Sequence, residues 1–421
     1  MTDYFVEKHL IKQTHKDYKE LDNLCFLSKN LYNATLYEVR KYFKETGKYM
    51  NYNSVNKLFT TQNQADYRAL PAKVAKHTQQ LVEANYKSFF ESLKADLKAR
   101  PPKYLDKNGR QVVHYEKGAL SFKAKENYIK LSKTNIFVKS NIAKENVEFV
   151  RIVHLGNHIN IEVGYKPKKE KKKNIKKKKL KIASFDPGLN NLFTLISNVD
   201  KPIIFNGKPM KSINQYYNKK RAKIQLELQT VNNKDWSKKL DTLTMKRNNK
   251  IDDYIHKLTT MIIDYLVSNQ VDLLIIGQSI GWKQDINLGK KNNQNFVNAP
   301  IAKAISKIKY KAEQKGMTVI VTEESYTSKA SFLDNDFIPT YDPKNKGDYK
   351  FSGKRIKRGL YKTATGATIN ADVNGALNIL KKYAIENGIW TEKLKNDLIK
   401  YCLIKHISVI TPPYKNKRSL E

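Results

Sequence analysis

The sequence predicts an α/β C-terminal half, preceded by an N-terminal half built from helices and a small all-β part. Three observations predict this. Helical apolar spacing dominates residues 16–100, and short strand-like runs dominate residues 104–165. Beyond residue 180, apolar strands alternate with longer amphipathic helices. The two halves are therefore expected to fold as separate domains.

The N-terminal half opens with a strand-like run at residues 4–11 and then becomes helical. One helix is expected over about 16–45. A second is expected from Pro71, a residue suited to a first helical position, to about Arg100, where two prolines stop it. This order predicts a β-barrel that is interrupted by helices. Its first strand lies in residues 1–12, the inserted helical domain is 13–103, and the rest of the barrel is 104–165.

A run of lysines follows, reading KPKKEKKKNIKKKKLK from residue 166 to 181. So dense a charge cannot pack into a core, so we assign residues 166–180 to a basic linker. Two interpretations stay open. It is either a flexible connector or a strap that lies against a phosphate backbone.

The C-terminal half predicts the element order of the RNase H fold: three strands, helices, a strand, a helix, a strand and a final helix. The expected strands are 180–185, 192–197, 202–205, 271–276 and 317–322. The expected helices are 212–232, 246–269, 299–315 and 370–382.

The net charge indicates a polyanionic partner. The chain has 79 Lys and Arg against 40 Asp and Glu, a formal net charge of +39. Such an excess repels itself, and nucleic acid is the obvious partner that would neutralise it. Two distant cysteines form no disulfide framework, and neither a membrane span nor a signal peptide is evident. A cytoplasmic protein that contacts no membrane is expected.

Two aspartates stand where this fold would carry chemistry. Asp186 ends the first apolar strand and is followed by Pro187-Gly188, although that tripeptide alone is often a plain turn. Asp372 opens the final helix, where the helix dipole would favour an acid in any case. Together they indicate a site for two Mg²⁺ ions, with Mn²⁺ as an alternative, that hydrolyses phosphodiesters. A third carboxylate is expected.

Several stretches identify a family resemblance, among them FDPGLNNLFTL, TEESYTSKASFLDND and INADVNGALNI. The chain resembles TnpB, the RNA-guided nuclease of bacterial insertion sequences, which is related to the small type V CRISPR (Cas12-type) effectors. The resemblance implies a wedge-type barrel with an inserted helical recognition domain, followed by a RuvC-like nuclease domain over 181–325 and 369–385. It also implies a target nucleic-acid-binding insert over 326–368 and leaves 386–421 as a C-terminal tail.

The chain departs from this family at the third carboxylate. Gly277 ends the fourth strand, where the family usually has Glu. We expect Glu323, beyond the fifth strand, to replace it, with Glu324 as the second choice. Successive strand residues point to opposite faces, so only one of the two should face the metals. Asp285, a site of only two acids, and an inactive site remain as alternatives.

Zinc is the second departure. Relatives often carry four zinc-binding cysteines from just after the Tyr-Thr-Ser motif. Here the segment that follows the motif, Lys329 to Asp334, contains no cysteine. No zinc is therefore expected. The insert would instead fold by apolar contacts from Phe332, Leu333, Phe337, Ile338, Tyr341 and Phe351.

The implied activity is RNA-guided DNA cleavage next to a short duplex motif, by one protein per guide. The partners would be a guide RNA derived from a transposon end and target double-stranded DNA. An inactive RNA-guided repressor is the main alternative. A transposase using the same fold is disfavoured by the helical insert, the barrel and the paired motifs. Expected nucleic-acid contacts are Lys208, Lys211, Tyr216, Tyr217, Lys219, Lys220, Arg221, Trp282, Lys283, Lys290, Lys291, Tyr326, Thr327, Ser328, Lys354, Arg355, Lys357 and Arg358.

Overall fold

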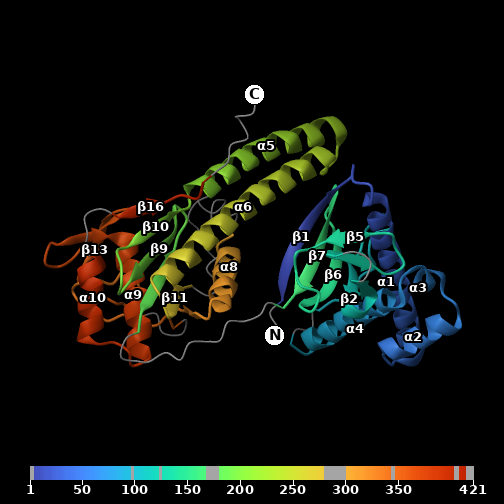
Figure 1. Cartoon of the computed structure of the whole chain (residues 1–421), viewed down its shortest axis with the longest axis horizontal. Coiled ribbons are helices and arrows are strands. Elements are labelled where there is room, and N and C mark those ends of the chain that lie inside the picture. Colours follow the sequence, from blue (N-terminus) through green and yellow to red (C-terminus); the bar gives the residue numbers. More distant parts are fainter. Residues whose placement is uncertain are drawn as a thin grey trace. The chain divides into compact units, whose positions relative to one another are not determined.

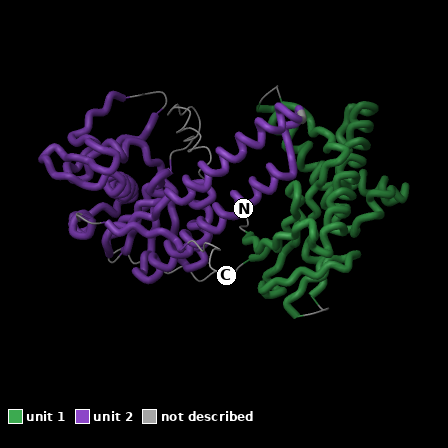
Figure 2. The backbone as a smooth tube through the Cα atoms, turned by 90° about the horizontal axis from the view of Figure 1, so that it is seen from above, with its two compact units in different colours: residues 1–168 green, residues 169–421 purple. Residues whose placement is uncertain are grey.

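The chain forms two compact units, residues 1–168 and 169–421 (Figure 2). The computed structural model describes residues 4–95, 99–122, 126–166, 180–278, 300–342, 347–402 and 407–413. The predicted basic linker falls almost wholly outside these ranges. In the described ranges, no helix is both long and apolar enough to cross a membrane.

Four helices make up one layer of the first unit. They are α1 (Tyr18–Thr46), α2 (Tyr52–Thr61), α3 (Ala65–Ala69) and α4 (Ala72–Ala95). Helix α1 ends at Gly47, whose left-handed backbone (φ 68°) lets its N–H bond the Phe43 carbonyl. The predicted long helices are α1 and α4. The short helices α2 and α3 between them were not predicted.

The strands of the first unit form two sheets. The larger has the order β1 (Phe5–Lys12), β7 (His158–Tyr165), β6 (Val147–His154) and β2 (Val113–Glu116). The smaller contains β3 (Leu120–Ser121), β4 (Tyr128–Leu131) and β5 (Phe137–Lys139). Because β1 pairs with β7 along its whole length, the helices are indeed inserted between strands of one sheet.

The predicted closed barrel is not found in the described residues. β1 and β2 are the two edges of the larger sheet, and each pairs on one side only. A turn of 3₁₀ helix, η1 (Lys117–Ala119), follows β2 directly and takes the chain out of that sheet. The short strands after it pair only with one another, so the two sheets stay separate.

A six-stranded sheet organises the second unit. Its order is β12 (Thr318–Thr322), β11 (Leu273–Gly277), β8 (Ile182–Pro187), β9 (Asn191–Ser197), β10 (Ile203–Asn206) and β16 (Ser408–Ile410). β8, β9 and β10 are antiparallel, and β11 and β12 run parallel to β8. The first, fourth and fifth predicted strands therefore lie side by side, as β8, β11 and β12.

Helices cover both faces of this sheet (Figure 1). α6 (Lys238–Ser268) and α8 (Ile301–Gln314) bury one face, with α5 (Lys208–Asn232) packed against α6 as a long hairpin. α9 (Ala371–Glu386) and α10 (Glu392–Cys402) bury the other. The apolar stripes of α6 and α9 explain this division, since each helix turns its buried residues to its own side of the sheet.

The C-terminal segment is not a tail, which corrects the assignment of residues 386–421. Helix α10 buries Leu394, Leu398 and Cys402 against the sheet. Strand β16 then pairs in parallel with β10 and extends the sheet by one strand. Both elements are short, and β16 has only three residues, so the sequence carries little periodicity there.

The insert is held together by hydrogen bonds and by part of the predicted apolar cluster, since Leu333 packs against the core and Phe351 against Tyr326. Its strands β13 (Lys354–Lys357), β14 (Leu360–Lys362) and β15 (Thr368–Asn370) form a small sheet. Phe332 is buried, but Phe337 is 80% exposed and Tyr341 is 49% exposed, so neither contributes to a core.

Two aspartates join the loops of the insert. The Asp334 carboxylate accepts from the Ser352 hydroxyl (3.0 Å) and the Ala364 N–H (2.9 Å). The Asp336 carboxylate accepts from the N–H groups of Ser331 (2.8 Å) and Ser352 (3.1 Å). Although partial burial raises the pKa of Asp334, the hydrogen bonds from Ser331, Ala364, Ser352 and Thr365 outweigh it and lower that pKa below its ordinary value.

The lowered pKa predicts a pH-dependent stability difference between the protein and its Asp334→Ala variant. A carboxylate with a depressed folded-state pKa stabilises the fold above its unfolded-state pKa of about 3.9. That contribution is lost as the pH falls through the lower folded-state pKa. Urea unfolding should therefore show a less stable variant at pH 7, by about 1–3 kcal/mol, and a shrinking difference below pH 4. A difference that stays constant down to pH 2 would contradict this.

Candidate active site

Asp186 lies at the carboxyl end of β8 and faces α9. Two residues earlier on the same face, the Ser184 hydroxyl donates to the Ala376 carbonyl (2.7 Å), which holds α9 close to the strand. A Cβ placed on Gly375 would lie 2.6 Å from Asp186 Oδ2. Gly375 therefore leaves the space that the Asp186 carboxylate occupies.

Asp372 lies in the first turn of α9. The N-cap residue Asn370 accepts the N–H groups of Asp372 and Val373, so the helix start is fixed. The Asp372 carboxylate accepts from Asn191 Nδ2 (2.6 Å) and from the Arg355 guanidinium (2.8 Å). These bonds orient it from β9 on one side and from the insert on the other.

Glu324 supplies a third carboxylate beside Gly277. A Cβ built on Gly277 would lie 2.7 Å from Glu324 Oε2 and 2.5 Å from the Ile379 Cδ1 atom. The glutamate carboxylate thus occupies the space next to β11 that a residue-277 side chain would enter. A glycine there is required by this close approach.

Glu323 has a different environment. Its carboxylate forms an ion pair with the buried Lys382 of α9 and accepts from the Ser325 N–H (2.6 Å). Burial raises the pKa of Glu323, but the hydrogen bonds from Lys382 and Ser325 outweigh that effect and hold the pKa below its ordinary value. The geometry therefore favours the second choice, Glu324, because β12 has already ended at Thr322 and its alternation no longer decides which way these residues face.

The three carboxylates act on one another electrostatically. Burial, then the negative charges of Glu324 and Asp372, raise the pKa of Asp186 well above its ordinary value, while Arg355 opposes this. One carboxyl near two like charges holds its proton more tightly unless a cation is present. An all-oxygen donor set under such repulsion fits a hard divalent cation.

The same residues are not arranged as a finished metal cage. In the described ranges, no three Asp, Glu, His or Cys side chains gather closely enough to hold a metal ion. Arg355 pairs with Asp372, and its side chain is 41% exposed. Asp372 would exchange this contact for a cation. Arg355 was expected only to touch phosphate, and nothing in its sequence context indicated the pairing.

The expected contacts on α5 divide into exposed and buried residues. Tyr216 is 60% exposed, with the Lys220 ammonium 5.8 Å from its ring centre. Tyr217 is buried, and its hydroxyl pairs with Thr244 of α6 (3.1 Å), so it packs between helices and is not available to stack on a base. Helical periodicity forces this, since adjacent residues lie on different faces. Lys219, Lys220 and Arg221 are exposed, as is Lys208.

The expected nucleic-acid contacts in the insert also divide into exposed and buried residues. Lys354, Arg355 and Lys357 are exposed along β13, and Arg358 follows them. In the Tyr-Thr-Ser motif only Ser328 is exposed. Tyr326 packs on Tyr349, and Thr327 is buried. Trp282, Lys283, Asp285, Lys290 and Lys291 lie outside the described residues.

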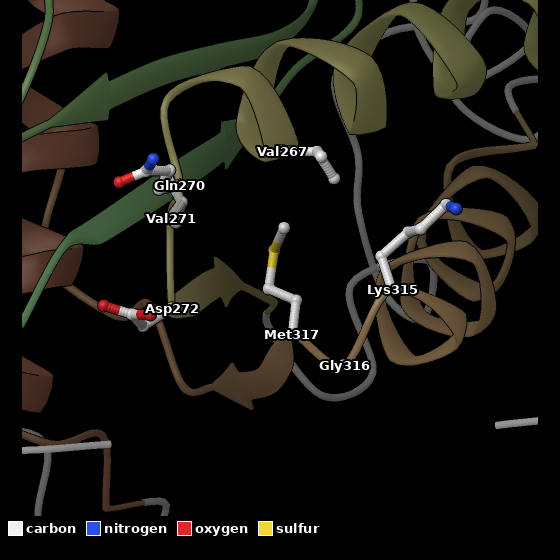
Figure 3. A pocket seen from close by; sticks show the side chains of 7 residues that line it. All are labelled: Val267, Gln270, Val271, Asp272, Lys315, Gly316 and Met317. Atoms are coloured by element: carbon white, nitrogen blue, oxygen red, sulfur yellow. The ribbon is translucent and has the colours of Figure 1, made fainter. Parts of the chain in front are cut away.

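A small pocket lies away from these acids. It is lined by residues that precede β11 and β12, among them Gln270, Asp272 and Met317 (Figure 3). The acids lie beyond the carboxyl ends of the same strands. Parallel strands present all their carboxyl ends on one edge, so the pocket is at the opposite edge of the sheet and is not part of the carboxylate site.

Comparison with known proteins identifies two segments. Residues 159–283 match the family model described as a probable transposase, OrfB_IS605. Residues 302–379 match the model of the Cas12f1-like TNB domain. The TnpB-like protein ORF457 of Acidianus two-tailed virus is 26% identical over 241 residues, which cover 53% of this chain. The match spans about half (49%) of the viral protein's length.

Solved structures give weaker likenesses. A Cas12f1–sgRNA–target DNA complex overlaps 89% of this chain and 98% of its own, with 14% identity and a TM-score of 0.33. Alicyclobacillus acidoterrestris C2c1 with single-guide RNA overlaps 87% and 70%, with 8% identity and a TM-score of 0.38. Scores this low do not establish a shared fold. The family models and the viral relative therefore show a likeness of this chain to the probable transposases of the OrfB_IS605 family and to a TnpB-like protein.

Proposed function

We propose that the protein is an RNA-guided DNA endonuclease with a RuvC-like, RNase H-fold nuclease domain, and that Asp186, Glu324 and Asp372 form its active site. The observation that carries the proposal is the place of Glu324, whose carboxylate lies against Gly277. It supplies an acid beside Asp186 at the point where the strand itself has none. The likeness to the probable transposase family, to the Cas12f1-like TNB domain and to the TnpB-like viral protein supports the reaction class.

Two Mg²⁺ ions, when bound, would activate the attacking water and stabilise the leaving oxygen of a phosphodiester. Three features of the chain bear on the binding of these ions and of the target. Asp186 has to lose the proton that burial and its neighbours favour. Asn191 holds Asp372 in a fixed orientation. Arg355 lies on the exposed insert next to the acids, where its guanidinium would meet a phosphate of the target.

Guide RNA and target DNA are the proposed partners, bound chiefly through their phosphates. The net charge of +39, the exposed lysines of α5 and the fully exposed strand β13 support this. Sequence would be read by base pairing with the guide, so the protein would need few contacts to base edges. One protein per guide is proposed, without zinc.

A second function, that of an RNA-guided DNA-binding repressor, is favoured by two observations. Gly277 removes the usual acid, and a single ion pair engages Asp372. A purified complex that binds its target but does not cleave it in Mg²⁺ or Mn²⁺ would establish this alternative.

The assignment of the three carboxylates predicts which variants lose DNA cleavage and which retain it. Asp186→Ala, Asp372→Ala and Glu324→Gln should each abolish Mg²⁺-dependent cleavage by the purified guide complex, because each removes a metal ligand. Binding of guide and target should be nearly unchanged.

Glu323→Gln is the matched control, since it alters the neighbouring carboxylate, which pairs with Lys382. It should cleave at a rate of the same order as the natural protein. Silence of Glu323→Gln together with normal cleavage by Glu324→Gln would reverse the assignment.

Gly375→Ala tests the close approach of α9 to Asp186. A helix-interior Gly→Ala change ordinarily stabilises a protein by about 0.5–1 kcal/mol. Here the new methyl group would displace the Asp186 carboxylate, so urea unfolding should show no such gain and cleavage should fall sharply. Gly359→Ala is the control, since a Cβ there would meet no atom within 4 Å. A stabilised, fully active Gly375→Ala protein would contradict the geometry.

The charge predicts a steep salt dependence of guide binding. Each neutralised phosphate releases counterions, so six to ten contacts would cost about 10³-fold or more in affinity between about 50 and 200 mM salt. Filter binding or fluorescence anisotropy would measure the slope. A flat dependence would show that contacts other than those to phosphates dominate.

A further inference from the structure

We propose that Asn374 and Asn378 of α9 are positioning residues that hold the turn after β12 and thereby aim Glu324 at Asp186. The proposal rests on the proposed function, because it concerns Glu324 as the third metal ligand. Neither asparagine would touch a metal or the nucleic acid. Both would act through the backbone of residues 324–332.

Glu324 needs such support because the sheet does not reach it. β12 ends at Thr322, whose carbonyl accepts the Gln278 N–H (2.8 Å). Glu324 is two residues beyond this point. A carboxylate on β11 would be fixed by strand hydrogen bonds on both sides, but a carboxylate on a turn depends on what holds the turn.

Within the turn, Glu324 is tied to Thr327. The Glu324 carbonyl accepts both the Thr327 hydroxyl (2.8 Å) and the Thr327 N–H (3.2 Å). Thr327 is buried, with 3% of its surface exposed. Whatever fixes Thr327 therefore also fixes the backbone from which the Glu324 side chain extends.

The two asparagines fix Thr327 and the residues after it. Asn378 Nδ2 donates to the carbonyls of Thr327 (2.8 Å) and Ala330 (2.7 Å). Asn374 Nδ2 also donates to Ala330 (2.7 Å), and its Oδ1 accepts the Phe332 N–H (3.0 Å). Both asparagines are fully buried, and because Asn378 Oδ1 has no hydrogen-bond partner among the described residues, the Asn378 amide is held by its two donated bonds alone. These four bonds are thus made in the absence of competing water.

The backbone of the turn indicates that it is held under constraint. Tyr326 has φ 66°, in the left-handed region that a bulky residue rarely adopts. Such a conformation is strained and persists only where the surroundings over-determine it. The asparagine bonds hold Thr327 and Ala330, which both follow Tyr326 in the turn, and so help to fix its conformation.

Asn378→Asp is the direct test, because it keeps the shape of the side chain and removes the two donated bonds. Hydrogen–deuterium exchange should speed up in residues 323–333, and this readout requires no activity. Cleavage by the saturated guide complex should slow by about 10–100-fold, the usual cost of losing a group that orients a metal ligand. The Mg²⁺ midpoint should rise, and affinity for guide and target should not change.

Asn198→Asp is the matched control. Asn198 holds the start of β8 in the same manner, with Nδ2 donating to the Leu180 carbonyl (3.0 Å) and Oδ1 accepting the Ile182 N–H (2.9 Å). It lies at the end of β8 opposite Asp186. Asn198→Asp should lower the unfolding midpoint but leave exchange in 323–333 and cleavage by folded complex unchanged.

Moving the third carboxylate from residue 324 to residue 277 distinguishes a positioning role of Asn378 from a purely structural one. In a Gly277→Glu, Ile379→Val, Glu324→Ala background, the acid is carried by β11, and the removed Cδ1 and carboxylate make room for it. Adding Asn378→Asp to that background should cost cleavage little. An equal loss in both backgrounds would overturn the positioning role and leave only a structural one.

Two outcomes distinguish this proposal from the function on which it rests. Wild-type cleavage by Glu324→Gln would overturn the assignment of Glu324 itself. A silent Glu324→Gln with unchanged exchange in Asn378→Asp would overturn the role of the asparagines alone. If the relocated background does not cleave, the exchange measurement still decides.

Discussion

The close packing of α9 against β8 and β11 is the contact on which the second unit depends. The Ser184–Ala376 hydrogen bond holds the helix to the strands. The two glycines, Gly375 and Gly277, leave the space that this close packing needs. This one helix bears Asp372, makes room for Asp186 and places Ile379 over β11. A bulkier residue at 375 or 277 would push helix and sheet apart and separate the acids.

The site has to offset the electrostatic repulsion between its carboxylates. Three carboxylates near one another disfavour the folded state unless a proton, an arginine or a metal compensates. In the structure Asp186 responds through its raised pKa, Asp372 through Arg355, and the neighbouring Glu323 is drawn away by Lys382. Lys382 therefore keeps a fourth acid out of the cluster, although it lies nearly three turns along α9 from Asp372.

The sequence was sufficient for those features that local patterns determine. Apolar periodicity predicted α1, α4 and the strands β8, β9, β10, β11 and β12, and two motifs predicted Asp186 at the end of a strand and Asp372 at the start of the final helix. It could not decide between Glu323 and Glu324, because their directions follow from a turn held by residues fifty positions away. Tyr217 and Phe337 were misjudged for a similar reason: composition indicates an aromatic side chain but not which neighbours cover it. The prediction of a barrel was wrong because the pairing of short strands depends on tertiary contacts, which the local sequence does not determine.

The order of elements along the chain has a consequence for how the second unit is made. The face of the sheet that contains Ile182, Ile196 and Ile275 is covered by α9 and α10, which are translated long after the strands themselves. The outer strand β16 follows later still. During synthesis the nascent sheet therefore presents an apolar face and an open edge to the cell until α9, α10 and β16 have been made. A growing chain of this kind is exposed to misassembly until its last helices emerge.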